Sequence, residues 1–423
     1  MSTRPVTKTA DPAGMTKMHI LVLAATCLFS WGTMGMPNAY GVFFTPMGEV
    51  LGVGRAAVTL HFSLRALAVG IASPFVAVLL KKGISIRKTM PIGLAVYMLM
   101  CILIAHTKSI ILVYIFAVIA GLGFATFSYM FIAIVLGNWF RKNLGTISGI
   151  AMAFSGVGSA IASPIVTKMI ESLGYQKAYI AYSAITVAMV LPLLLLPFYP
   201  EDADLLPYGA GVDEASEDQK LKKKAGMTSR NLDLPYSFPS AMALILFLLT
   251  FFCVGLTSLN SHLPSLAIAN GFSADIGALL LSASMIGNLS FKLVLGVLID
   301  KLGVLKGFLI VLMIMIAGSL IILFVTGAVA PLLVGGFLYG TIFSLGSLGL
   351  SLLARFLYGN EQYNGIYAKT ALITSVGAAV YTTLIGVMYD ATGSYTLPIF
   401  MGVAMAGISI AMIFWIMIRV RKL

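Results

Sequence analysis

Three basic side chains, Arg65, Lys292 and Lys369, lie inside long apolar segments of this sequence. If its segment is helical, Lys292 is roughly 12 Å deep, counted from Asp300 at the segment's end. A charge at the centre of a bilayer costs at least about 2.5–3.5 kcal/mol unless a partner or water meets it. The 15 acidic residues of the chain all lie in tails, in loops or at the ends of apolar segments. A bound anion could neutralise these cations, and the pattern therefore predicts a site for an anionic substrate.

Polar and aromatic side chains extend this candidate site. His61 is one turn before Arg65 and could share the site or titrate with it; it could equally be a capped polar residue near the outer surface. Arg65 itself could be a third cation for a dianion, or it could pair with backbone carbonyls at a helix end. Tyrosine hydroxyls can donate to a carboxylate, although most tyrosines of membrane proteins are packing or interface residues. The tyrosines of the candidate pore helices are Tyr40, Tyr129, Tyr339 and Tyr381, and His262 is expected at the rim or gate.

The composition is that of a membrane protein, with the lipid bilayer as an expected partner. Of the 423 residues, 59% are hydrophobic and 10% are charged, whereas soluble domains have about 25% charged residues. The net charge of +12 does not indicate nucleic-acid binding, because the basic residues lie in short loops. Three cysteines lie in apolar runs, and we recognise no nucleotide-binding loop, metal cluster or nucleophile triad. We therefore expect no cofactor, no metal and no enzymatic activity.

The apolar segments follow the order six, polar linker, six. This order predicts an all-α membrane protein with twelve transmembrane helices in two six-helix halves. The two halves resemble each other weakly at an offset of about 220 residues, and two related halves with a site at their interface are the plan of many secondary transporters. The expected division is an N-terminal tail at 1–18, a first half at 19–198, a linker at 199–236, a second half at 237–418 and a C-terminal tail at 419–423.

The positions of lysine and arginine predict the orientation. If both termini are cytoplasmic, 20 of the 27 Lys and Arg residues fall in cytoplasmic segments, four fall in external loops and three lie inside spans. Cytoplasmic loops of membrane proteins carry such an excess. We therefore expect cytoplasmic termini and a cytoplasmic linker. The short loops suit a multi-pass protein of a bacterial inner membrane, and we expect it to function as a monomer.

Short motifs in the chain resemble a known family. Gly296, Asp300, Lys301 and Gly303 are spaced as in the cytoplasmic loop motif of the major facilitator superfamily. The equivalent loop of the first half has Leu80 where the motif has aspartate. The stretch at 138–151 is similar to the loop entering helix 5 of the monocarboxylate and oxalate:formate transporters, and the stretch at 389–395 resembles the end of helix 11 in the same group. The resemblance implies the major facilitator fold and a conformational role for the loop motif.

The same resemblance implies roles for individual residues. Lys292 stands before Gly296 where the related carriers have an arginine in helix 8, and a lysine offers a point charge in place of a bidentate fork. Asn288 stands where proton-coupled monocarboxylate carriers have an aspartate, which removes the obvious proton carrier. Lys369 lies in a stretch that resembles helix 11 of oxalate:formate exchangers, whose lysine helps to hold the dicarboxylate. Lys369 could alternatively extend its amine to the nearby membrane surface.

The function expected from these features is secondary active transport of a small organic carboxylate by alternating access, with exchange as the preferred mechanism. An empty carrier with uncompensated central cations should reorient with difficulty, so one anion would leave as another enters. The first alternative is proton-coupled monocarboxylate symport with His61 or a deprotonating lysine as proton carrier. An alternative of another class is a membrane receptor that keeps a carrier fold without transporting. The sequence does not choose among oxalate, formate, lactate, pyruvate and larger dicarboxylates.

Overall fold

The computed structural model describes residues 15–82, 85–128, 130–142, 144–209, 232, 234–235, 240–324 and 327–420; these residues form helices and turns, with no β-strand among them. Ten of the described helices are long and apolar enough to cross a membrane, and shorter apolar helices accompany them. Lipid offers no partner to backbone N–H and C=O groups, so a spanning segment satisfies them internally as a helix. The expected all-helical fold is confirmed, and the count of twelve spans stays a prediction.

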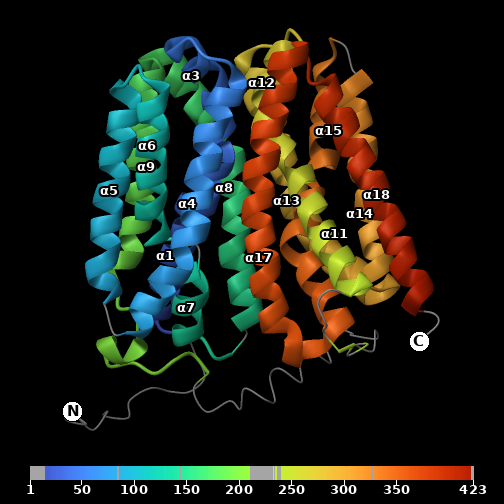
Figure 1. The fold of residues 1–423 in the computed structure, drawn as a ribbon. Coiled ribbons are helices and arrows are strands. Elements are labelled where there is room, and N and C mark those ends of the chain that lie inside the picture. Colours follow the sequence, from blue (N-terminus) through green and yellow to red (C-terminus); the bar gives the residue numbers. More distant parts are fainter. Residues whose placement is uncertain are drawn as a thin grey trace.

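The first half runs from α1 to α9 (Figure 1). α1 begins after Thr16, whose hydroxyl accepts a hydrogen bond from the backbone of His19. The helical segment that begins with α1 continues through α3 and ends at Gly52. The φ of Gly52 is 65°, a left-handed conformation that glycine adopts without strain. Its α-helices are α1 (Lys17–Ser30), α2 (Met36–Asn38), α3 (Phe44–Leu51), α4 (Arg55–Lys81), α5 (Ile86–His106), α6 (Ile110–Ala125), α7 (Met130–Trp139), α8 (Leu144–Leu173) and α9 (Tyr175–Leu195).

The second half runs from α11 to α18. Ser240 and Ser273 cap α11 and α13 by accepting backbone hydrogen bonds in the first turn. α17 comprises two helices, because Gly359 breaks it with φ of 70° and ψ of −179°. The α-helices are α11 (Ala241–Ser258), α12 (Leu263–Ala269), α13 (Ala274–Leu302), α14 (Val304–Phe324), α15 (Val329–Gly340), α16 (Ile342–Ser344), α17 (Leu350–Thr392) and α18 (Thr396–Val420).

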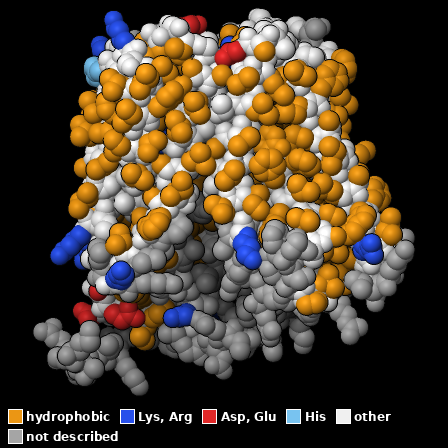
Figure 2. Space-filling model, viewed as in Figure 1, with side chains coloured by type: hydrophobic (Ala, Val, Ile, Leu, Met, Phe, Trp, Pro, Cys, Tyr) orange, Lys and Arg blue, Asp and Glu red, His pale blue; other side chains and the backbone are white. Residues whose placement is uncertain are grey.

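Each half packs around a hydrophobic core of its own. The halves lie side by side, and α1 begins and α18 ends at the same end of the bundle (Figure 1). We call this the terminal end, and we call the opposite end, which carries α3 and α12, the distal end. Apolar side chains cover the outer surface between the two ends, and most charged side chains in this view lie near the ends (Figure 2). The outer surface is therefore suited to a lipid environment.

The first helical segment of each half is interrupted at a matching position. A 3₁₀ turn, η2 (Ala39–Phe43), precedes α3, and a second 3₁₀ turn, η4 (Leu259–His262), precedes α12. Ala39 and Leu259 are 220 positions apart (259 − 39), which is the offset at which the two halves resemble each other in sequence. A π-helical turn, η1 (Trp31–Gly35), adds a further interruption in the first half.

The fourth helical segment of each half is also interrupted at a matching position. α6 ends at Ala125 before α7 begins, and a π-helical turn, η5 (Leu345–Gly349), lies between α16 and α17. Ala125 and Leu345 are again 220 positions apart (345 − 125). Interrupted helices at corresponding positions of two halves are typical of the substrate-binding region in secondary transporters.

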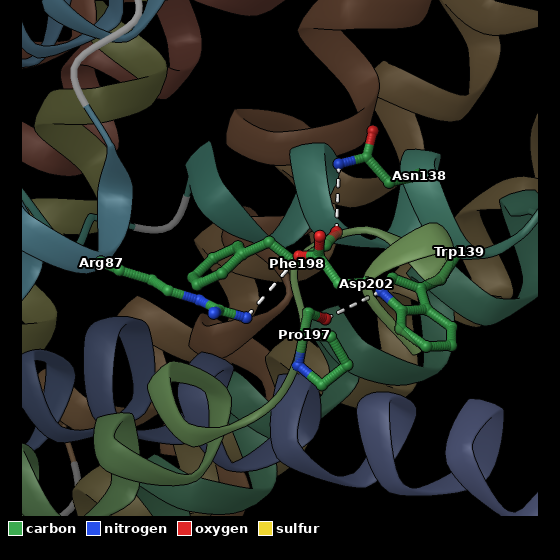
Figure 3. A network of polar contacts seen from close by, with 6 residues as sticks. All are labelled: Arg87, Asn138, Trp139, Pro197, Phe198 and Asp202. Carbon is green, nitrogen blue, oxygen red and sulfur yellow. Dashed lines mark hydrogen bonds and ion pairs between the residues drawn. The ribbon is translucent and has the colours of Figure 1, made fainter. Parts of the chain in front are cut away.

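The segment that follows α9 packs against the terminal end of the first half (Figure 3). The Trp139 indole donates to the carbonyl of Pro197 at 3.1 Å, and Asn138 donates to that of Phe198 at 3.3 Å. Arg87 and Asp202 form an ion pair at 3.6 Å with both side chains about half exposed. Pro197 and Phe198 are the last residues of the predicted first half, and the predicted linker then joins it through Asp202 and through the backbone N–H of Tyr208, which donates to the carbonyl of Trp139 at 2.9 Å.

Candidate functional site

Lys292 lies on the row of α13 that faces the boundary between the halves. Leu281, Met285, Asn288 and Lys292 form this row at spacings of four, three and four residues, which places them on one helix face. The exposed large side chains of α13 lie on other faces: Leu279, Ile286, Leu293 and Val297. Leu281 belongs to the core of the first half although it lies in the second. The row that carries Lys292 therefore points toward the first half, whereas its contact with a substrate stays a prediction.

α13 contacts α8 of the first half along its distal part. The Ser163 hydroxyl donates to the carbonyl of Ala278 at 3.2 Å, and the Ser282 hydroxyl donates to that of Ala160 at 2.6 Å. Near the middle of both helices, a Cβ at Gly156 would lie 3.4 Å from Leu289. The two halves are therefore in direct contact from the distal end to mid-depth.

Among the described residues, the glycines that continue the facing rows of α8 and α13 toward the terminal end lie beside open space. Gly149 lies seven residues from Gly156 on the same face of α8, and Gly296 lies seven residues from Leu289 on the same face of α13. A Cβ at Gly149 or at Gly296 would meet no heavy atom within 4 Å. Lys292 lies between Leu289 and Gly296, so it is placed where the two halves separate toward the terminal end.

No carboxylate neutralises Lys292 among the described residues. The Lys292 amine has no hydrogen bond or ion pair with any of them. The ion pair seen among the described residues joins Arg87 of the first half to Asp202. Asn288, one turn away, is 2% exposed, and its Oδ1 has no described hydrogen-bond partner. A half-buried cation beside an unmatched buried carbonyl oxygen is an unusual pair, because each group loses hydration without gaining a partner.

Lys369 lies on a different kind of surface. It is exposed, and it shares one face of α17 with four exposed apolar side chains at spacings of three, four, four and seven residues: Leu372, Val376, Val380 and Val387. Residues on the flanks of this face pack against neighbouring helices, as Ser375 does against Gly70 of α4. The face itself points outward. This placement favours the alternative in which the Lys369 amine extends to the membrane surface.

The structure brings Tyr40, His61 and Arg65 together in the core of the first half. The Tyr40 hydroxyl is hydrogen-bonded to Nε2 of His61 at 2.6 Å and to the hydroxyl of Tyr179 at 3.0 Å. Nδ1 of His61 is hydrogen-bonded to the carbonyl of Val58. A carbonyl only accepts, so Nδ1 carries a proton. The guanidinium of Arg65 lies 4.7 Å above the centre of the Tyr40 ring.

The remaining predicted tyrosines have packing roles where they are described. Tyr339 is buried, and its hydroxyl donates to the carbonyl of Leu256 inside the second half. Tyr381 is buried with its ring centre 4.9 Å from that of Phe251. Tyr129 lies outside the described residues. No contact of Tyr339 or Tyr381 with Lys292 is seen in the described part of the chain, so their predicted role in binding is not supported by proximity.

The predicted loop motif lies at the terminal end of α13. Gly303 follows this helix with φ of 84°, a conformation that favours glycine. Lys301 is exposed in the last turn of the helix. The side chain of Asp300 lies outside the described residues. Among the described residues no group of three or more His, Cys, Asp and Glu side chains could hold a metal ion.

The distal end is closed by a contact between the halves that the sequence did not reveal. The Asp390 carboxylate at the end of α17 accepts hydrogen bonds from the backbone N–H groups of Arg55 at 2.9 Å and Ala56 at 2.8 Å. These are the first residues of α4, where unpaired N–H groups and the helix dipole favour a negative charge. The Arg55 guanidinium lies 4.0 Å above the Tyr389 ring and donates to the Tyr395 hydroxyl at 2.6 Å.

Aromatic rings continue this contact toward mid-depth. Phe44 of the first half lies between Phe62 and His262, with ring-centre distances of 6.1 and 5.3 Å. His262 is fully buried, and its Nε2 is hydrogen-bonded to the carbonyl of Thr382 at 3.0 Å. His262 is thus part of the closed distal end, in agreement with its predicted place near a gate. The described hydrogen bonds between the halves all lie from mid-depth to the distal end.

Comparison with known proteins places this geometry in a family. The family model of the Major Facilitator Superfamily matches residues 21–278, more than half of the chain. A protein of Escherichia coli strain K12, described as the uncharacterized MFS-type transporter YhjX, is 25% identical over 319 residues, which are 74% of each chain. The crystal structure of a mutant form of the nucleoside transporter NupG is similar with a TM-score of 0.67, covering 95% of this chain and 98% of that one at 14% identity.

The likeness to the nucleoside transporter is one of fold, because the identity is low. The family match, the transporter relative and the apolar helices agree with the paired halves, the interrupted helices and the one-sided closure. Together they show a multi-pass membrane transporter of this type. The chain belongs to the Major Facilitator Superfamily.

Proposed function

We propose that this transporter moves small organic carboxylates by alternating access, with Lys292 as the cation that meets the carboxylate. One observation carries the proposal: Lys292 faces the boundary between the halves where they separate, and no described residue neutralises it. A carboxylate would compensate this charge. A neutral substrate would leave it uncompensated at mid-depth, where its cost is several kcal/mol.

Asn288 is proposed to orient the substrate beside Lys292. Its buried Oδ1 lacks a donor among the described residues, and its amide lies one turn from the amine on the same helix face. An amide and a point charge set fewer geometric demands than a bidentate guanidinium. We therefore expect the site to accept several small carboxylates with similar affinity.

Exchange is the proposed mechanism. Closing the terminal end around an empty site would enclose the Lys292 charge with no counter-ion, which raises the free energy of the closed empty carrier. A bound carboxylate removes this cost. Reorientation of the loaded carrier should then be faster than that of the empty carrier, so one anion enters as another leaves.

The proposed topology places the terminal end in the cytoplasm. The excess of Lys and Arg in segments at that end supports it. Each interrupted segment counts as one span in this topology. These segments are α1–α3, α6–α7, α11–α12, and α15–α16 with the first part of α17. The proposal thus has twelve spans, in halves at 19–198 and 237–418. A bacterial inner membrane and a functional monomer complete the proposal.

Proton-coupled symport through His61 is less well supported. His61 lies in the core of the first half, and both of its ring nitrogens are engaged, Nε2 with the Tyr40 hydroxyl and Nδ1 with the carbonyl of Val58. Asn288 leaves no carboxylate next to Lys292. No observation favours a receptor without transport, and absence of flux with retained binding would identify one.

Thermal unfolding of purified protein with mono-, di- and tricarboxylates tests the proposal. A ligand at 100 times its Kd should stabilise the wild type by roughly 2.7 kcal/mol. Lys292→Gln should abolish this stabilisation. Lys369→Gln, on the outward face of α17, is the matched control and should retain it. If no carboxylate stabilises the wild type, the proposed substrate class is wrong. If Lys369→Gln also loses the response, Lys369 contributes to carboxylate binding as the resemblance implies, despite its outward placement in this structure.

A further inference from the structure

Arg65 is a second buried cation, and it lies apart from the boundary between the halves. It is 7% exposed, and it projects from α4 into the core of the first half, with its guanidinium 4.7 Å above the Tyr40 ring and 5.2 Å from the centre of the Phe62 ring. Ring faces at this distance attract a guanidinium only modestly. That attraction offsets only part of the cost of a charge in an apolar core.

The polar groups around Arg65 do not neutralise it. Its neighbouring ionisable groups are His61, Cys101 and the tyrosines 40, 97, 179 and 182, and none of them is a carboxylate. The hydroxyls of Tyr40 and Tyr179 are hydrogen-bonded to each other, and Tyr182 donates to the carbonyl of Met36 at 2.7 Å. Among the described residues Arg65 has no hydrogen bond or ion pair.

Space remains next to the guanidinium. No nitrogen of Arg65 belongs to the fully enclosed polar atoms that lack a partner in the described chain. The Tyr97 hydroxyl lies near Arg65 and beside the Cys101 thiol, which is only a weak acceptor. Because no described residue is a hydrogen-bond partner of Arg65, its nitrogens border space that a water-sized molecule can reach. The ring neighbours Tyr40, Tyr97 and Tyr179 are at most 1% exposed, so this space is narrow.

We propose that Arg65 holds a small monovalent anion of the size of chloride inside the first half, at a site distinct from Lys292. One negative charge balances one guanidinium, and the in-plane N–H groups are free to donate because the aromatic rings cover the faces. The Tyr97 hydroxyl supplies a further donor. The anion is resident: it neutralises the core of the first half while the carboxylate at Lys292 comes and goes.

Full-length protein in detergent tests this site with chloride as the probe. Wild type should unfold at a higher temperature in sodium chloride than in sodium isethionate at equal ionic strength, because this sulfonate is much larger than chloride and carries no carboxylate that could bind at Lys292. Arg65→Met should lose this chloride response. Arg65→Lys keeps the charge and should retain a weaker response, which separates loss of the site from a general folding defect. Lys292→Gln should keep the full chloride response while it loses the response to carboxylates.

Equilibrium dialysis with radioactive chloride gives a second readout. The wild type should bind about one chloride per chain, Tyr97→Phe should bind it several-fold more weakly, and Arg65→Met should bind none. Equal stability of the wild type in chloride and isethionate with no bound chloride would overturn the proposal. A chloride response that survives in Arg65→Met but is lost in Lys292→Gln would assign chloride to the transport site, and the separate site would then be wrong.

Discussion

The carboxylate of Asp390 caps the first turn of α4 at Arg55, although the two residues are 335 positions apart and belong to different halves. The cap joins the end of α17 to the start of α4 through two backbone hydrogen bonds, and an arginine stacked on Tyr389 covers it. A negative charge at a helix N-terminus is favourable. The distal end is therefore held shut by contacts that must break before it opens.

Asp390→Asn should shift the protein toward opening at the distal end. The substitution removes the charge and one acceptor, which costs the closed form about 1–2 kcal/mol and changes the population ratio about 5- to 30-fold. Alkylation of a cysteine at Ser265, whose hydroxyl is hydrogen-bonded to that of Thr45 across the halves, would report this opening. The control is Glu49→Gln. Glu49 is a carboxylate at the same end, and it has no described hydrogen bond or ion pair to the other half. Unchanged alkylation in Asp390→Asn would show that the cap does not limit opening.

Gly54→Ala should open the same end without changing any charge. A Cβ at Gly54 would lie 2.5 Å from Oδ2 of Asp390, closer than two such atoms can approach, so the carboxylate must move away from α4. We expect the same direction of change in Ser265 alkylation as for Asp390→Asn. Gly407→Ala, whose new Cβ would meet no atom within 4 Å, should have no effect. Normal closure in Gly54→Ala would mean that the cap adapts without loss.

Asn288→Leu should raise stability and lower carboxylate affinity. A buried polar atom without a partner costs about 1–3 kcal/mol, and a leucine of similar volume removes that cost. The same substitution removes the amide proposed to orient the substrate. Chemical denaturation and carboxylate titrations measure the two effects separately. A less stable variant would contradict the assignment of Oδ1 as unmatched, and an unchanged affinity would remove Asn288 from the site.

Tyr40→Phe should destabilise the first half. It leaves Nε2 of His61 without its hydrogen-bond partner and removes a bond to Tyr179 in a buried core, at a cost of about 1–3 kcal/mol. Tyr381→Phe provides a comparison in the second half, because no hydrogen bond of its hydroxyl is seen among the described residues. We expect that change to be nearly neutral in thermal unfolding. Equal losses in both variants would show that the tyrosine network contributes little.

Much of the fold could be predicted from the sequence, because a long apolar segment in lipid must pair its backbone N–H and C=O groups internally and therefore forms a helix. The depth of Lys292 along its helix could be estimated, since the helical rise and the nearby end of the span determine it. The direction of its side chain follows only from the row that it shares with Leu281, which packs in the core of the first half. The interrupted helices were not predicted, because the offset between the halves relates their positions only once the structure shows the turns at Ala39 and Leu259.

The remaining features depend on contacts that no local pattern encodes. Lys369 and Lys292 have similar sequence surroundings, and only the neighbours of α17 show that Lys369 points outward. Arg65 was expected near the substrate because of its depth, but the face of α4 that carries it packs into the first half. Asp390 was recognisable as a span end, whereas its partner in α4 is set by the packing of the two halves.

Gly149 and Gly296 have a consequence for the size of the motion. At the distal end, Gly41 lets two backbones approach so closely that a Cβ there would overlap the carbonyl oxygen of Ser261. Gly149 and Gly296 would likewise allow α8 and α13 to approach each other closely at the terminal end. In this structure a Cβ at either position would meet no described atom within 4 Å. Each glycine thus sets how far one end can close. We therefore expect a single methyl group at Gly296 to act as a spacer that limits how closely α13 can approach α8 at the terminal end.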